Sequence, residues 1–465
     1  MFTSLNGLVN SILSLAAAGG MVAGADLPRG AVIETLAAAG DPTETYALYL
    51  PSGYDPTVPA PVLYLLDARG RALLPLERFR EASEATGVIL ASSYRSRSDE
   101  HTDPNLPALR AMWADTHERL RIDDRRVYLG GFSGTARAAC LMADLAPGAI
   151  AGVIAAGAGF AAGHPPRRDT PFAFFGAVGD ADFNYGEMQE LDRKLAGLER
   201  PYRLEVFEGP HDWMPPEVAA AALRWMELRA VADARRGASP QLVAAAWDRD
   251  VARAAALEAS GRAFEARRQW TWITRDYQGL HAVDAARQRA DSLAEAAHAE
   301  ERDRVAREKR EAQRVQEAQR VLARAAAPEG EPTPLPRIVS ELQIEALRTR
   351  AAAEGEDARA ASRFLNAVFV QTAFYLPRDA RERGDLERAA LFLSVASVVR
   401  PEDPQVWYRL AATESRQGRR RQAVDALQRA VEKGFADGKR LEGDADFDRL
   451  RQDPDFRGLA ARLGR

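Results

Sequence analysis

Between residues 30 and 230, short apolar runs alternate with longer amphipathic stretches. The runs are mostly continuous in apolar residues, as expected for strands buried on both faces. Strand and helix alternating in this way predict a mostly parallel β-sheet covered by helices. The predicted strands are Tyr46–Leu50, Val62–Leu66, Val88–Ser92, Val127–Gly130, Gly152–Ala156, Phe172–Val178 and Arg203–Phe207. The predicted helices are roughly Leu76–Thr86, Leu106–Leu120, Thr135–Leu145, Tyr185–Leu198 and Pro216–Ala230.

From about residue 240 the strand pattern stops and the chain is helical in pattern to its end. Residues 295–327 are highly charged, with oppositely charged pairs four residues apart that favour a solvated helix. Because basic and acidic residues are interleaved, this helix is not expected to bind nucleic acid. Four prolines within residues 328–337 predict a stiff linker. The expected order is an α/β domain over 30–230, a helical region over 240–327, the linker, and an all-α domain over 338–465.

A repeat with a period of 34 residues occupies part of the last domain. Its small residues let two helices approach closely, and its glycines fall where a helix–helix turn is expected. In period and residue type it resembles the tetratricopeptide repeat, and Trp407 stands where that family often has tryptophan. The resemblance implies a helical scaffold that binds a protein partner. Leu376, Gly384, Ala389, Leu393 and Ala396 recur as Leu410, Gly418, Ala423, Leu427 and Ala430, with a weaker copy at Gly261, Ala266 and Trp270.

The first 25 residues have no charged side chain and contain the apolar run Leu8–Leu15. With the small-x-small sequence Ala23-Gly24-Ala25, they predict a signal peptide cleaved before Asp26, and therefore export to the periplasm or beyond. Lysine and arginine are missing near Met1, so the alternative is an uncleaved apolar leader on a protein that stays in the cytoplasm. Any membrane contact is expected through this segment alone.

Composition narrows the function classes. The chain has 465 residues, a net charge of −4 and one cysteine, Cys140. A single cysteine excludes an intramolecular disulfide framework and a cysteine-rich metal site, and the acidic balance argues against a nucleic-acid binder. Because the sequence shows no metal-ligand spacing, phosphate loop or dinucleotide fingerprint, neither a metal nor a cofactor is expected.

The most informative stretch runs from Arg126 to Cys140. An apolar strand leads into Gly130-Gly131-Phe132-Ser133-Gly134 and then directly into an alanine-rich helix. A serine in so tight a turn is presented outward, provided that its neighbours are small, and Gly131 and Gly134 meet this need. The N-terminus of the helix also stabilises negative charge that develops beside it.

Two later loops carry partners for this serine. Gly179-Asp180-Ala181-Asp182 follows one predicted strand, and Gly209-Pro210-His211 follows the next. Open α/β sheets place their sites at the carboxyl ends of the strands, where both loops lie. His211 is therefore the candidate base. Asp182 and Asp180 are both candidates for the acid that orients this base.

The segment Gly131-Phe132-Ser133-Gly134 resembles the nucleophile elbow of the α/β-hydrolase superfamily, nearest to dienelactone hydrolases and polyhydroxybutyrate depolymerases. In that family the triad follows the chain order serine, acid, histidine, and the acid has a Gly-x-x-Asp spacing that Asp182 matches from Gly179. The resemblance implies that Ser133 is the nucleophile, His211 the base and Asp182 the orienting acid, with Gly134 and either Ala68 or Arg69 as oxyanion-hole donors.

The first hypothesis is a serine esterase that forms an acyl-enzyme from a small or polymeric acyl ester and is fused to a protein-interaction scaffold. Phe183, Trp213 and Met214 flank the acid and base and predict an apolar wall for the acyl group. Two departures from the family pattern motivate a second hypothesis, a non-catalytic scaffold with a degenerate hydrolase domain. Thr135 replaces the second glycine, and Asp67-Ala68 replaces His-Gly. A serine peptidase of the same fold is the third hypothesis.

Overall fold

The computed structural model describes residues 27–99, 102–327 and 333–463. The predicted signal peptide and part of the predicted linker lie outside these residues. The chain forms two compact units, residues 1–306 and residues 307–465, which are described separately below. No helix in the described ranges is long and apolar enough to cross a membrane.

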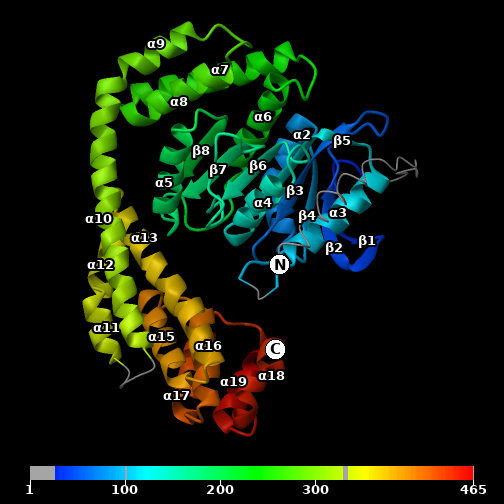
Figure 1. The fold of residues 1–465 in the computed structure, drawn as a ribbon. Helices are drawn as coiled ribbons and strands as arrows, with labels where there is room; N and C mark the ends of the chain where they lie inside the picture. Colours follow the sequence, from blue (N-terminus) through cyan, green and yellow to red (C-terminus); the bar gives the residue numbers. More distant parts are fainter. Residues whose placement is uncertain (1–26, 100–101, 328–332, 464–465) are drawn as a thin grey trace. The chain divides into compact units, whose positions relative to one another are not determined.

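The first unit is built on an eight-stranded sheet with the order β1-β2-β4-β3-β5-β6-β7-β8 (Figure 1). The β1–β2 and β2–β4 pairs are antiparallel, and every other neighbouring pair is parallel. The predicted α/β class with a mostly parallel sheet, followed by an all-α region, is thereby confirmed. The strands are β1 (Val32–Ala38), β2 (Asp41–Tyr49), β3 (Ala60–Leu66), β4 (Ile89–Ser93), β5 (Ile122–Phe132), β6 (Gly152–Ala156), β7 (Ala173–Gly179) and β8 (Tyr202–Phe207).

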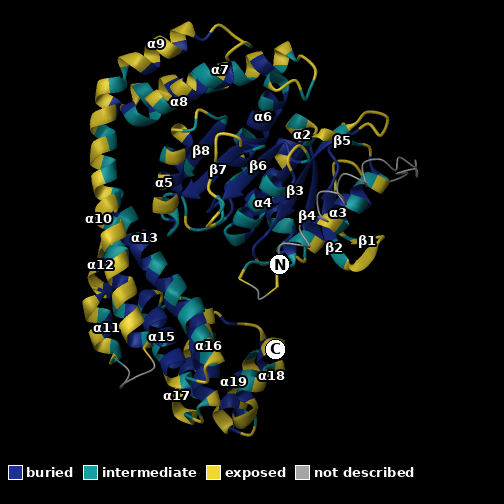
Figure 2. Cartoon of the chain, in the orientation of Figure 1, coloured by how far each residue is buried: buried dark blue, intermediate teal, exposed yellow. Residues whose placement is uncertain are grey.

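Two hydrophobic cores sandwich the sheet, and the strands between them are buried (Figure 2). Strand side chains alternate between the faces, so Leu63 and Leu65 enter one core while Val62, Tyr64 and Leu66 enter the other. Helices α2 (Leu73–Thr86) and α6 (Pro216–Ala232) cover the first face. Helices α3 (Asn105–Arg119), α4 (Gly134–Leu145) and α5 (Tyr185–Ala196) cover the second.

Strand β1 was not predicted, and β2 begins five residues earlier than expected. Both differences have one cause. β1 is an edge strand with exposed residues at Glu34 and Thr35, and the first residues of β2 are exposed as well. A strand with so little burial lacks the apolar run by which buried strands are recognised.

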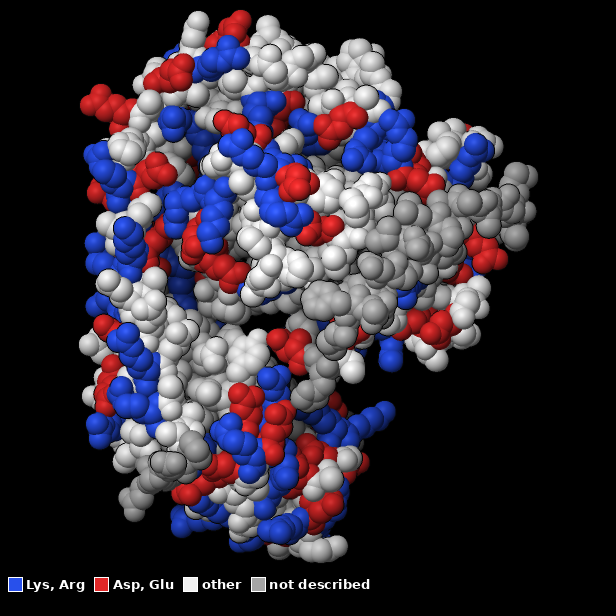
Figure 3. Space-filling view, in the orientation of Figure 1, with Lys and Arg blue, Asp and Glu red and all other residues white. Residues whose placement is uncertain are grey.

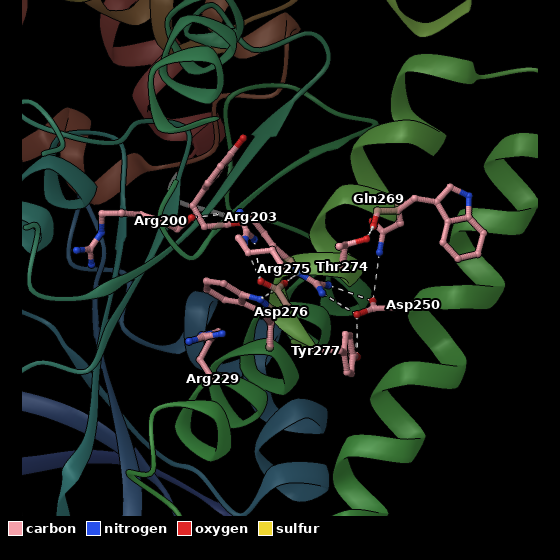
Figure 4. Close-up of polar contacts among 12 residues, drawn as sticks. Arg200, Arg203, Arg229, Asp250, Gln269, Thr274, Arg275, Asp276 and Tyr277 are labelled. Atoms are coloured by element: carbon pink, nitrogen blue, oxygen red, sulfur yellow. Dashed lines mark hydrogen bonds and ion pairs between the residues drawn. The ribbon is translucent and has the colours of Figure 1, made fainter. Parts of the chain in front are cut away.

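Helices α7 (Pro240–Ala259), α8 (Ala263–Asp276), α9 (Asp284–Ser292) and the first part of α10 (Ala294–Ala326) belong to the same unit as the sheet. An ion-pair network joins α7 and α8 to β8 (Figure 4). The buried Arg203 of β8 lies 2.6 Å from Asp250 of α7 and 2.9 Å from Asp276 of α8. The boundary between the units therefore falls inside the charged helix α10, not at the proline-rich segment.

Within its described residues the second unit consists of helices joined by short turns, and contains no strand. The predicted linker over 328–337 is wrong at its C-terminal end, because residues from 335 onward begin α11. Pro334 caps this helix and Pro336 lies in its first turn, where proline needs no intrahelical N–H partner. The elements are α11 (Leu335–Glu341), α12 (Ile344–Ala351), α13 (Glu356–Val370), the π-helical turn η1 (Gln371–Tyr375), α14 (Leu376–Glu382), α15 (Leu386–Val399), α16 (Pro404–Arg416), α17 (Arg420–Glu432), α18 (Gly438–Gly443), the 3₁₀ helix η2 (Ala445–Leu450) and α19 (Pro454–Leu463).

The two glycines of the 34-residue repeat lie in helix–helix turns. Gly384 joins α14 to α15 and Gly418 joins α16 to α17, with φ of 77° and 74°. Such left-handed backbone conformations favour glycine, which has no Cβ to clash. Pro377 follows the π-helical turn within the continuous helix 356–382, and the carbonyl of Ala373, four residues earlier, accepts a hydrogen bond from Arg409 of α16 instead.

Candidate active site

Ser133 occupies the turn between β5 and α4 in a strained conformation, with φ of 58° and ψ of −123°. The turn tolerates only small residues beside it. A Cβ on Gly131 would lie 2.4 Å from the Thr135 carbonyl oxygen, and one on Gly134 would lie 2.4 Å from the Ser98 Cβ. A non-glycine residue held at positive φ stores strain that the surrounding structure must overcome, and such residues cluster at functional sites.

Thr135, which replaces the expected second glycine, is fully buried and hydrogen-bonded. Its hydroxyl accepts the Phe132 N–H at 3.0 Å and lies within hydrogen-bonding distance of the Leu66 carbonyl at the end of β3. The threonine therefore ties the serine turn to the end of strand β3. Its buried side chain braces the turn from inside.

His211 and Asp182 contact each other directly. Nδ1 of His211 lies 2.8 Å from each carboxylate oxygen of Asp182. The Asp182 side chain is completely buried, whereas that of His211 is 18% exposed. The backbone N–H of Asn184 donates to Asp182 at 2.8 Å and fixes the carboxylate from the other side. A buried carboxylate on Nδ1 leaves Nε2 as the ring nitrogen able to exchange a proton with a reacting group.

Asp180, the alternative acid, has a different contact. Its carboxylate accepts the backbone N–H of Gly209 at 3.0 Å. Asp180 thereby holds the loop that carries His211, while Asp182 holds the imidazole itself.

Gly157, which no motif in the sequence marks, lies under the histidine–aspartate pair. It follows β6 with φ of 65°, and a Cβ there would lie 3.0 Å from Cε1 and Nδ1 of His211 and 3.2 Å from Asp182. The Asn184 side-chain amide donates to the Gly157 carbonyl at 2.7 Å. A single glycine after a buried strand is common, so the sequence offers no signal that separates this one from a turn glycine.

Aromatic rings surround the imidazole on two sides. The centroid of the Phe183 ring is 4.2 Å from that of His211, and the centroid of the Phe132 ring is 4.6 Å away. Trp213 and Met214, predicted to line an acyl wall with Phe183, instead lie inside the core on the α2–α6 face, 2% and 0% exposed. Of the three predicted wall residues, only Phe183 packs against the imidazole.

Ser133 and His211 come from the carboxyl ends of β5 and β8, and Asp182 follows β7. The Ser133 N–H donates to the Ala156 carbonyl at 2.8 Å, one residue before Gly157 under the imidazole. Within the described ranges, no hydrogen bond links the Ser133 hydroxyl to His211. Catalytic hydrogen bonds in enzymes without substrate are often long and shorten in the complex.

The loop after β3 presents one of its two candidate oxyanion donors. The Arg69 N–H donates to the Asp67 carboxylate at 2.8 Å and is thus occupied. In the described part of the chain the Ala68 N–H makes no hydrogen bond, nor does that of Gly134. The Ala68 carbonyl accepts the N–H of Ser98, whose side chain packs against Gly134, so the two segments that carry these N–H groups are connected.

Asp67 organises this loop from a completely buried position. Its carboxylate accepts the backbone N–H of Arg71 at 3.0 Å, the Arg71 guanidinium at 2.9 and 3.1 Å, and the Trp213 indole N–H at 2.8 Å. Burial alone would raise the pKa of Asp67, but the hydrogen bonds from Arg71 and Trp213 outweigh it and the pKa lies below its usual value. The carboxylate therefore links the loop after β3 to the loop of His211.

The residues that the structure describes include no group of three or more histidine, cysteine, aspartate or glutamate side chains arranged to hold a metal ion.

No protein-family model and no curated protein matches the chain. Several solved structures of esterases and serine hydrolases resemble its α/β part. S-formylglutathione hydrolase (FrmB) from Staphylococcus aureus is 15% identical, and the match covers 43% of this chain and 99% of that one with a TM-score of 0.35. An esterase from Pyrobaculum calidifontis is 13% identical over 49% of this chain and 93% of that one, with a TM-score of 0.34. A ferulic acid esterase is 17% identical over 42% and 94%, with a TM-score of 0.31. At these identities the similarity concerns the fold alone.

Proposed function

We propose that the first unit is a serine hydrolase that cleaves carboxylic esters through an acyl-enzyme. One observation carries the proposal. A serine in a strained strand-to-helix turn shares a sheet edge with an imidazole whose Nδ1 is held by a buried carboxylate at 2.8 Å. This arrangement has the chain order and the roles of a serine–histidine–aspartate triad.

In the proposed reaction the Ser133 oxygen attacks the ester carbonyl carbon, and His211 takes the serine proton on Nε2. The imidazolium is stabilised by Asp182, which also fixes the tautomer. His211 then returns the proton to the leaving alcohol as the carbon–oxygen bond breaks. Water attacks the acyl-enzyme by the same sequence, with His211 again taking and returning a proton.

The oxyanion of each tetrahedral intermediate would bind the N–H groups of Gly134 and Ala68. Gly134 begins α4, so the N-terminal end of that helix adds favourable electrostatics. Ala68 is the better second donor because the Arg69 N–H is already bonded to Asp67. The departures at Asp67 and Thr135, which motivated a degenerate domain, thus both support this geometry: each side chain is buried and hydrogen-bonded to the oxyanion loop or the serine turn.

We also propose that the second unit is a scaffold for a protein partner, as the tetratricopeptide-like repeat implies. The support is the placement of Gly384 and Gly418 in equivalent turns between antiparallel helices. Stacked helix pairs of this kind present extended surfaces suited to partners.

The test of the hydrolase is turnover of short-chain p-nitrophenyl esters by the full chain and by Ser133→Ala. The substitution is expected to lower kcat/KM by several orders of magnitude, because the nucleophile is lost. Ser292→Ala, on an exposed serine of α9, is the control and should keep full activity. Equal activity of Ser133→Ala and the unmodified chain would exclude the proposal, and greater turnover of peptides than of esters would favour a peptidase.

A further inference from the structure

A small cavity of about 90 Å³ lies in the first unit, lined by residues of α6, α7 and β8. None of Ser133, Asp182 and His211 lines it, so it is separate from the proposed active site. Sites for drug-sized molecules have volumes of roughly 300–1,000 Å³. This cavity therefore admits a group of only a few atoms.

Positive charge exceeds negative charge around the cavity. Four arginines line it against two carboxylates, which leaves an excess of two positive charges in a chain whose net charge is −4. The arginines are Arg203 of β8, Arg224 of α6, and Arg249 and Arg253 of α7. On the face of the molecule in Figure 3, by contrast, basic and acidic side chains are interspersed. A concave site lined by excess charge of one sign attracts ligands of the opposite sign.

Both carboxylates of the cavity are already paired. Asp250 accepts two hydrogen bonds from the guanidinium of Arg203, at 2.6 and 3.0 Å (Figure 4). Glu205 pairs with Arg253 at 2.6 Å. Since each carboxylate is engaged with one arginine, neither neutralises the other two.

Those two arginines, Arg224 and Arg249, have no hydrogen bond or ion pair among the residues that the structure describes. Arg224 is half-buried, and its pKa lies below the usual value because burial and then the positive charge of Arg249 disfavour the charged guanidinium. Arg249 lies four residues before Arg253 on α7, a spacing at which like charges destabilise a helix. An anion bound among these groups would offset both repulsions.

The N–H groups of Arg224 and Arg249 are accessible from the cavity, since both residues line it and neither side chain is buried. The rest of the wall offers no competing polar group. Ala221, Leu228 and Ala246 are apolar, and the indole N–H of Trp225 donates to Asp276 at 2.8 Å. A ligand in this cavity is therefore recognised by the two guanidinium groups.

We propose that this cavity binds a phosphate group, held between Arg224 of α6 and Arg249 of α7. A doubly charged phosphate balances the two arginines that lack a partner, whereas a carboxylate balances only one. Its tetrahedral oxygens accept hydrogen bonds from guanidinium groups that come from two different helices. The ligand is inorganic phosphate or a small phosphate ester whose remainder extends into solvent. The proposal involves no residue of the triad and does not depend on the hydrolase activity.

The test is isothermal titration of the full chain with inorganic phosphate, glycerol 2-phosphate and acetate at one ionic strength. A mildly alkaline pH keeps phosphate mostly doubly charged. One phosphate is expected to bind per chain, about tenfold or more tightly than acetate, because it carries twice the charge. Binding of glycerol 2-phosphate as well would assign a phosphate ester to the site, and binding of inorganic phosphate alone would assign the free ion. Equal affinity for phosphate and acetate, or no binding of phosphate, would overturn the proposal.

Two variants locate the bound phosphate. Arg224→Gln and Arg249→Gln each remove one of its proposed partners and should each weaken phosphate binding about tenfold, the loss of one charge-assisted contact. Arg249 is exposed, so its replacement is not expected to disturb the fold. The matched control is Arg110→Gln, which removes the same charge from an exposed position of α3, on the opposite face of the sheet, and should bind phosphate normally.

The comparison separates a defined site from attraction to the charge of the whole protein, because all three variants have the same net charge. If Arg224→Gln and Arg249→Gln bind phosphate like the parent, or if Arg110→Gln weakens binding as much as they do, the proposal is wrong.

Discussion

Replacing Asp67 by asparagine tests how the loop after β3, which carries the proposed oxyanion donor Ala68, is held. The carboxylate accepts five hydrogen bonds, from the N–H groups of Arg69 and Arg71, the Arg71 guanidinium twice, and the Trp213 indole. Asparagine keeps one oxygen. With that oxygen at the Oδ1 position, three bonds survive, and the new NH₂ group faces two donors, Trp213 Nε1 and Arg71 Nη2.

The loss of stability depends on whether the two donors find other hydrogen-bond partners once the carboxylate oxygen is gone. Trp213 is 2% exposed, so its N–H stays unsatisfied, at a cost of about 1–3 kcal/mol. The Arg71 side chain is 39% exposed and is partly rehydrated, so its loss adds about 1 kcal/mol. Asp67→Asn should therefore lower the free energy of unfolding by about 2–4 kcal/mol. If the loop moves and Ala68 no longer reaches the oxyanion, kcat should fall by about 10²–10³-fold.

The assays are urea denaturation of the full chain and kcat for p-nitrophenyl acetate. Asp169→Asn is the matched control, because Asp169 is 83% exposed in a surface ion pair that contributes little. The reasoning is refuted if Asp67→Asn has the urea midpoint and kcat of the parent.

Two further predictions concern the site and its charges. Gly157→Ala should lower kcat about 100-fold, because the added methyl group displaces His211. The control is Gly163→Ala, which should leave kcat unchanged because Gly163 is also left-handed, with φ of 80°, but has open space at its Cβ position. Equal effects of the two substitutions on kcat would contradict the placement of Gly157 beside His211. The pKa values of Asp67 and Asp276 lie below their ordinary value of 3.8, although burial alone would raise both. For Asp67 the hydrogen bonds from Arg71 outweigh the effect of burial, and for Asp276 the positive charges of Arg275 and Arg203 outweigh it. Since the folded state then binds fewer protons than the unfolded state, their contribution to stability is complete above about pH 4 and is lost as pH falls through the lowered values. Thermal unfolding midpoints measured from pH 6 to pH 2 should therefore fall, and they should fall less for Asp67→Asn than for the parent. A midpoint that does not decrease towards acid pH would contradict the lowered pKa values.

The buried parts of the fold were predictable because a strand covered on both faces must be apolar along its length. This applies to Val62–Leu66 and Gly152–Ala156, which were located within two residues of their actual ends. The edge strand β1 carries no such pattern. The prolines led to an incorrect linker boundary because proline is favoured both in a stiff linker and in the first turn of a helix. The backbone preference of Pro334 and Pro336 is therefore the same in either structure, and only packing decides that a helix begins there.

The serine, histidine and aspartate could be located because each follows a recognisable strand. The contacts that hold them could not, since they join segments far apart in the sequence. Asp67 and Trp213 are 146 residues apart, and Gly157 and Asn184 are 27 apart. For the same reason the sequence alone presents Asp67 and Thr135 as departures from a motif, although in the folded chain their hydrogen bonds hold the loop after β3 and the serine turn.

The most direct test of the central claim is to treat the full chain with a fluorophosphonate and locate the adduct by peptide mass spectrometry. A serine activated by His211 and Asp182 should carry a single adduct on Ser133, formed much more slowly after His211→Ala. A chain that stays unlabelled, or that is modified with equal speed when His211 is replaced, would contradict a serine hydrolase at this site.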